Sequence, residues 1–90
     1  MEKYIITKIE STVKKYNLIN IKLLYVTKIS DKDVPDYWIV TLSGGENGRD
    51  RFSNYLEDVK HIIDQFDHTW LIKWENDCLD DVWTLKFGIR

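Results

Sequence analysis

A helical pattern followed by two strand-like segments occurs twice in this chain, and that order limits the folds open to 90 residues. In residues 50–66, large apolar residues recur three and four positions apart, as expected for one buried face of a helix. A weaker pattern of the same kind predicts a helix over residues 3–16, ended by Asn17 and Asn20. The two apolar stripes are Phe52, Tyr55, Leu56, Val59, Ile62, Ile63 and Phe66, and Ile5, Ile9, Val13 and Tyr16.

Each helix is followed by two segments whose composition and alternation favour strands. Polar turns separate the strands of each pair, and the first turn contains the only proline. The predicted strands are residues 21–29, 37–43, 67–75 and 82–89, with turns at 30–36 and 76–81.

The order α-β-β-α-β-β predicts one α+β domain over residues 1–90, with a four-stranded antiparallel sheet. A hairpin cannot bury its apolar face alone, so both helices are expected on one face of the sheet. A right-handed crossover gives the strand order 3-4-2-1. This topology resembles a circularly permuted ferredoxin-like sandwich.

Strict alternation then sorts the strand side chains between the two faces of the sheet. It predicts that all four tryptophans lie under the helices, with Val40, Leu42, Leu85, Phe87 and Ile89. The opposite face keeps more apolar side chains than an open sheet normally shows, and they predict a homodimer through that face as one alternative. That set is Leu24, Val26, Tyr37, Ile39, Leu71 and Val82, between Lys22, Lys28, Lys73 and Lys86.

Composition excludes several classes of protein. No run of about 18 apolar residues occurs, and no apolar segment of signal-peptide type follows Met1, so we expect neither a membrane span nor a leader. The single Cys78 forms no disulfide within the chain, which fits a reducing cytoplasm. The net charge of −2 is unevenly distributed: residues 1–30 have six lysines against two glutamates, and the remainder has seven basic and thirteen acidic groups.

The glycine-rich segment 44–48 precedes the second helix, which opens with Arg49 and Arg51. Backbone amides at a helix N-terminus favour anions. The segment lacks the Lys-Ser/Thr of a P-loop, however, and its glycines fit no dinucleotide-binding spacing. We interpret it as a turn, with the two arginines as candidate contacts to a ligand.

The sequence predicts no enzyme, no metal site and no cofactor. Glu57, His61 and Asp64 share one side of the second helix, but no second histidine joins them, so a solvated face is the better interpretation. The acidic neighbours of Cys78 disfavour a thiolate.

Seven acidic residues in or beside the two hairpin turns lie next to aromatic residues in sequence, and the turns are expected at opposite ends of the sheet. Acidic groups steer basic partners and aromatic groups supply buried area. We therefore predict a protein-binding domain, of inhibitor or immunity type, for a basic partner that handles nucleic acid. The predicted contacts are Asp31, Asp33, Asp36, Tyr37, Glu75, Asp77, Asp80 and Asp81.

A nucleic acid or phosphate ligand is the alternative partner. It would be held by the lysines of the open sheet face or by the 44–51 segment. Some ferredoxin-like domains bind RNA by stacking bases on aromatic side chains of an open sheet. Strict alternation offers only Tyr37 for that purpose here.

Overall fold

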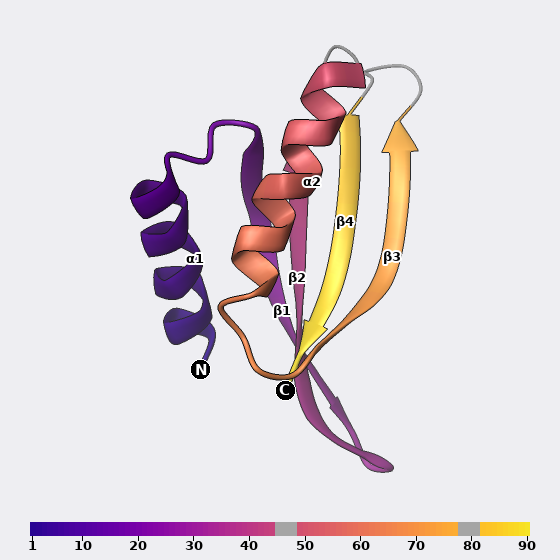
Figure 1. Cartoon of the computed structure of the whole chain (residues 1–90). Helices are drawn as coiled ribbons and strands as arrows, with labels where there is room; N and C mark the ends of the chain where they lie inside the picture. The colour runs from indigo at the N-terminus through magenta and orange to yellow at the C-terminus, as the bar shows by residue number, and fades with distance from the viewer. Residues whose placement is uncertain (45–48, 78–81) are drawn as a thin grey trace.

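The computed structural model describes residues 1–44, 49–77 and 82–90, and the side chains in these ranges except those of residues 49–52 and 77. Over these residues the chain forms two helices and four strands in the predicted order. Both helices cover one face of the sheet, and the β1–β2 hairpin extends beyond them (Figure 1). The elements are α1 (Glu2–Tyr16), β1 (Ile21–Asp31), β2 (Val34–Gly44), α2 (Arg49–Ile63), β3 (Thr69–Asp77) and β4 (Val82–Ile89).

The sheet is antiparallel throughout, with the strand order β1-β2-β4-β3. This is the predicted order, with β2 and β4 in the centre. The α+β fold and the sequence of elements are therefore confirmed. Within the described ranges, neither helix combines the length and the apolar character that crossing a membrane requires.

The end of α1 shows why the chain turns where the sequence predicted. Asn17 adopts a left-handed conformation with φ 53° and ψ 53°. The Leu18 N–H donates to the Val13 carbonyl at 2.9 Å, which closes the last turn of the helix. The Asn20 N–H then donates to the Asp58 carboxylate of α2 at 3.1 Å. That bond ties the connection between α1 and β1 to the second helix.

The first hairpin is longer than predicted. Its strands reach Asp31 and restart at Val34, and the Asp33 N–H donates to the Asp31 carboxylate at 3.0 Å. Pro35 is compatible with the central strand β2 because β4 pairs with β2 only from Trp38 onward. The tip of the hairpin is therefore a two-stranded ribbon that extends past the rest of the sheet (Figure 1).

The core lies between the helices and the sheet. The helices contribute buried aliphatic residues and Tyr55, whose hydroxyl donates to the Leu42 carbonyl at 3.1 Å. Trp38, Trp74 and Trp83 pack against this core while remaining partly exposed. Its buried members are Ile5, Ile9, Leu18, Val40, Leu42, Tyr55, Val59, Ile62, Leu85, Phe87 and Ile89.

Two β-bulges overturn part of the predicted division between the faces. The β1–β2 register shifts between Leu23 and Tyr25, and the β3–β4 register shifts between Leu71 and Lys73. Each shift leaves one extra residue, Leu24 in β1 or Ile72 in β3. The side chains from Tyr25 to Ile29 and from Thr69 to Leu71 therefore lie on the face opposite to the one that strict alternation predicts.

The prediction that all four tryptophans lie under the helices is therefore wrong for Trp70. It pairs with Gly88, whose neighbour Phe87 is in the core, so Trp70 is on the opposite face. Val26 instead pairs with Val40 and packs against the core. Lys28 pairs with Trp38 and Leu71 pairs with Phe87, which places both on the helix side rather than the open side.

Candidate functional site

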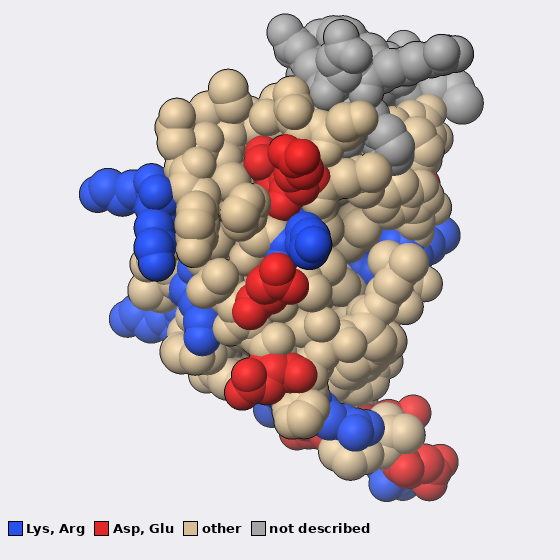
Figure 2. All heavy atoms as spheres, in the orientation of Figure 1, with Lys and Arg blue, Asp and Glu red and all other residues tan. Residues whose placement is uncertain are grey.

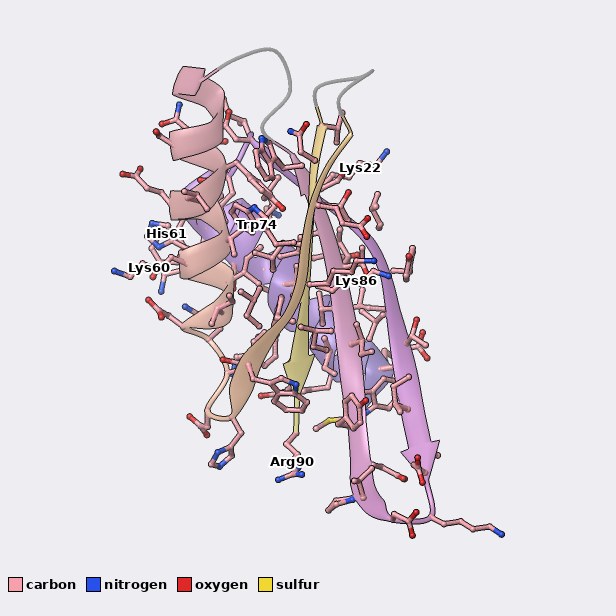
Figure 3. All side chains as sticks on the ribbon, turned by 90° about the vertical axis from the view of Figure 1, so that its right-hand side faces the viewer. Lys22, Lys60, His61, Trp74, Lys86 and Arg90 are labelled. Atoms are coloured by element: carbon pink, nitrogen blue, oxygen red, sulfur yellow. The ribbon has the colours of Figure 1, made fainter. Side chains whose placement is uncertain are left out.

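The side of the sheet without helices, which we call the open face, is the candidate site. Its side chains follow from the observed register, and Figure 3 shows Lys22 and Lys86 projecting from the sheet on the side away from α2. Trp74, in contrast, lies between the sheet and α2 (Figure 3). The open face comprises Lys22, Tyr25, Thr27, Ile29, Tyr37, Ile39, Thr41, Ser43, Trp70, Lys73, Glu75, Val82, Thr84, Lys86 and Gly88.

One end of the open face is aromatic. The rings of Trp70 and Tyr37 lie 5.3 Å apart and are tilted by 56°. A Cβ atom on Gly88 would come within 2.8 Å of indole atom Cη2, so the absence of a side chain there leaves the space that the indole occupies. Trp70 is 40% exposed. A third aromatic residue, Tyr25 on β1, is 52% exposed and lies nearer the middle of the face, because it pairs with Thr41.

The middle of the open face is cationic. Lys73 and Lys86 are direct cross-strand partners, an arrangement of like charges that is unfavourable alone. Glu75 relieves it by forming an ion pair with Lys73. The hydrogen bond and charge of Lys73 lower the pKa of Glu75, and the charge of Lys86 acts in the same direction. The same contact raises the pKa of Lys73.

The predicted acidic contacts do not form one surface. Asp31, Asp33 and Asp36 lie at the tip of the first hairpin, where Figure 2 shows acidic and basic groups intermixed. Asp36 forms an ion pair with Lys28 at 3.5 Å. The end of β3 and the start of β4 lie at the opposite end of the sheet from the tip of the first hairpin (Figure 1), and Glu75 is on the open face beside Lys73.

Several predicted residues have side chains outside the described part of the chain. They are the acidic residues Asp77, Asp80 and Asp81, together with Arg49 and Arg51; Cys78, for which the sequence disfavours a thiolate, lies there too. Segment 45–48 also lies outside it, so the phosphate interpretation of the glycine segment stays a prediction.

The polar face of α2 has a different environment. Glu57, Lys60, His61 and Asp64 line a shallow depression. The His61 ring stacks on Tyr16 of α1, with centroids 4.6 Å apart and an angle of 22°. Among the described residues, no cluster of three or more His, Cys, Asp or Glu side chains has a geometry that could hold a metal ion. His61 thus joins the two helices.

Sequence reasoning placed Lys22, Lys73, Lys86 and Tyr37 on this face but missed the aromatic groups of Tyr25 and Trp70. The available signals were two apolar doublets, Leu23-Leu24 and Leu71-Ile72, which interrupt the alternation at the bulges. A doublet of this kind is compatible with either register. Gly88 was a further signal, since a glycine inside a strand marks a bulge or a close approach.

Comparisons with known proteins provide no relative for this chain: no family model matches it, and neither the curated proteins nor the solved structures contain a match.

Proposed function

We propose that this chain is a non-enzymatic binding domain that holds single-stranded nucleic acid on the open face of its sheet. The observation that supports this most strongly is the effect of the two bulges. They add Tyr25 and Trp70 to a face that already has Tyr37 and three lysines. Exposed aromatic groups among cations are the combination with which proteins bind single strands.

The aromatic groups supply stacking surfaces. Each base stacked on an aromatic side chain contributes roughly 1–3 kcal/mol, and the gain depends little on base identity. Tyr25 and Trp70 are on the two edge strands, three strand spacings apart across the sheet, or about 14 Å at the usual spacing. They are also offset along the strands, since Tyr25 lies in the row of Lys86 and Lys73 and Trp70 lies in the row of Gly88. A strand crossing the sheet from β1 to β3 would therefore meet both rings and pass the central lysines.

The lysines supply attraction to the backbone phosphates. Although the whole chain has a net charge of −2, Lys22, Lys73 and Lys86 outnumber Glu75 among the described charged groups of the open face. Electrostatic attraction depends on this local charge. The same charges disfavour a second copy of the chain as the occupant, because a two-fold interface would bring lysine-rich surfaces together.

Fluorescence anisotropy with labelled single-stranded DNA and RNA oligonucleotides of about 12 nucleotides tests the proposal. Trp70→Ala and Tyr25→Ala should each weaken binding by about fivefold or more. Tyr4→Ala is the matched control, because Tyr4 is 54% exposed but belongs to α1. Absence of binding to either polymer at low salt would refute the proposal. A dimer that Ile39→Lys dissociates would then assign the open face to a second copy.

A second candidate function is the predicted binding of a basic protein, now restricted to the first hairpin. The specific observation in its favour is that the tip of the β1–β2 hairpin extends beyond the helices (Figure 1), and Asp31, Asp33 and Asp36 belong to this tip. In that case Asp31→Asn with Asp33→Asn should slow association with a captured partner and flatten its salt dependence. Unchanged association kinetics at low salt would count against this role.

A further inference from the structure

Thr41 is a side chain of the open face whose polar group is buried without a partner among the described residues. It is fully buried in the central strand β2, and its Oγ1 has no hydrogen-bond partner among the described residues. Buried polar groups are normally paired, because an unpaired one loses its water without compensation. A valine would fill nearly the same space without that cost.

A second buried threonine, whose hydroxyl is paired, shows the contrast. Thr12 in α1 is also buried, but its hydroxyl donates to the Lys8 carbonyl at 2.8 Å. Thr41 has no such bond, although its cross-strand partners Tyr25 and Lys86 are both polar. The fold therefore retains an unpaired hydroxyl at the centre of the face that we propose binds nucleic acid.

The side chains beside Thr41 are those that a bound strand would engage. Tyr25 is half exposed, and Lys86 has a long, flexible stem. Stacking of the Tyr25 ring on a base, together with attraction of the Lys86 ammonium to a phosphate, would draw both side chains away from the sheet. Their movement would uncover the hydroxyl between them.

We infer that Thr41 is a specificity-determining residue, whose hydroxyl forms a hydrogen bond with the edge of a base bound at the centre of the open face. This inference rests on the proposed function. The phosphates already have lysine partners, whereas a neutral hydroxyl can donate to or accept from a base edge. Thr41 should therefore influence which base is preferred, and the lysines should determine how binding depends on salt.

The test uses the full chain and labelled homopolymers of each base, as DNA and as RNA, with affinities measured at several salt concentrations. The wild type should prefer one base. Thr41→Val should lose about 5–10-fold in affinity for that base and little for the others, as expected for one hydrogen bond. Its salt slope should be unchanged. Thr41→Ser, which keeps the hydroxyl, should retain the preference.

Lys86→Gln is the matched variant on the neighbouring strand, and it should reduce the salt slope for all homopolymers without changing the base preference. Urea unfolding should find Thr41→Val at least as stable as the wild type. If the oligonucleotides bind but Thr41→Val keeps the base preference, or if the wild type has none, the inference fails while the proposed function stands. If no oligonucleotide binds, both fail.

Discussion

The two faces of this sheet are made by the same four strands, yet they differ in whether a buried hydroxyl group has a hydrogen-bond partner. On the helix-covered face, the buried hydroxyl of Tyr55 is paired with the Leu42 carbonyl, and the surrounding residues form a closed apolar core. On the open face, the buried hydroxyl of Thr41 is unpaired and two large aromatic groups are exposed. The first pattern is that of a core selected for stability. The second is typical of a surface on which stability has been exchanged for binding.

The glycines provide the strongest test of this comparison, because one lies on each face. In β2, Gly44 faces the helices, and an added Cβ would overlap the Asn20 carbonyl and lie 2.6 Å from Tyr55. Neither a backbone atom nor a buried ring can move away easily. We expect Gly44→Ala to lower the free energy of unfolding by roughly 2–4 kcal/mol, measured by urea denaturation. A cost below about 1 kcal/mol would show that this face is less rigid than its packing indicates.

Tyr55 offers a second test, on the helix-covered face alone. Tyr55→Phe should cost about 1 kcal/mol near neutral pH, since it removes one buried hydrogen bond. Tyr25→Phe on the open face is its control and should cost almost nothing, because that hydroxyl is on a half-exposed side chain.

Tyr55 also predicts that the free energy of unfolding decreases at alkaline pH. Burial raises the pKa of Tyr55 well above its ordinary value of 10.0. The unfolded chain therefore releases this proton first as the pH rises, so the stability that is present below pH 10.0 falls above it. Unfolding curves at increasing pH should show a smaller loss for Tyr55→Phe than for the wild type. Parallel losses in the two proteins would mean that other groups govern alkaline unfolding.

A third test concerns the glycine of the open face. The Cβ of Gly88→Ala would overlap the six-membered ring of the Trp70 indole, but this side chain is partly exposed, so it has solvent into which it can move. The stability change should stay within about 1 kcal/mol, in contrast to Gly44→Ala. The contact between Trp70 and Tyr37 should nevertheless be lost, which near-ultraviolet circular dichroism can detect, and oligonucleotide binding should weaken severalfold. An unchanged spectrum with unchanged binding would contradict the assigned position of Trp70.

The sequence was sufficient to predict the elements, their order and the arrangement of the strands, because these depend on patterns repeated over many residues. The division of side chains between faces depends on single residues. One extra residue at Leu24 and another at Ile72 reverse the parity, and the apolar doublets that contain them fit either register. The core residues of the two central strands were predicted correctly, because β2 and β4 pair without a register shift. The candidate site was predicted only in part, since Tyr25 and Trp70 come from the bulged edge strands.

The two exposed ion pairs allow the smallest and most specific test. Lys73–Glu75 is on the open face, and Lys28–Asp36 is on the helix side of the projecting hairpin, with similar exposure of the paired side chains. If phosphates bind at the open face, Glu75 competes with them for Lys73. Glu75→Gln should then strengthen oligonucleotide binding about two- to threefold at low salt, an effect that added salt should reduce.

Asp36→Asn is the matched control and should leave binding unchanged, because the lysine it releases points to the other side of the sheet. Equal gains from both variants would mean that overall charge, rather than a located surface, attracts the strand. A gain from Asp36→Asn alone would move the binding surface to the first hairpin. Only a gain confined to Glu75→Gln connects the electrostatic attraction to the face that has the exposed aromatic groups.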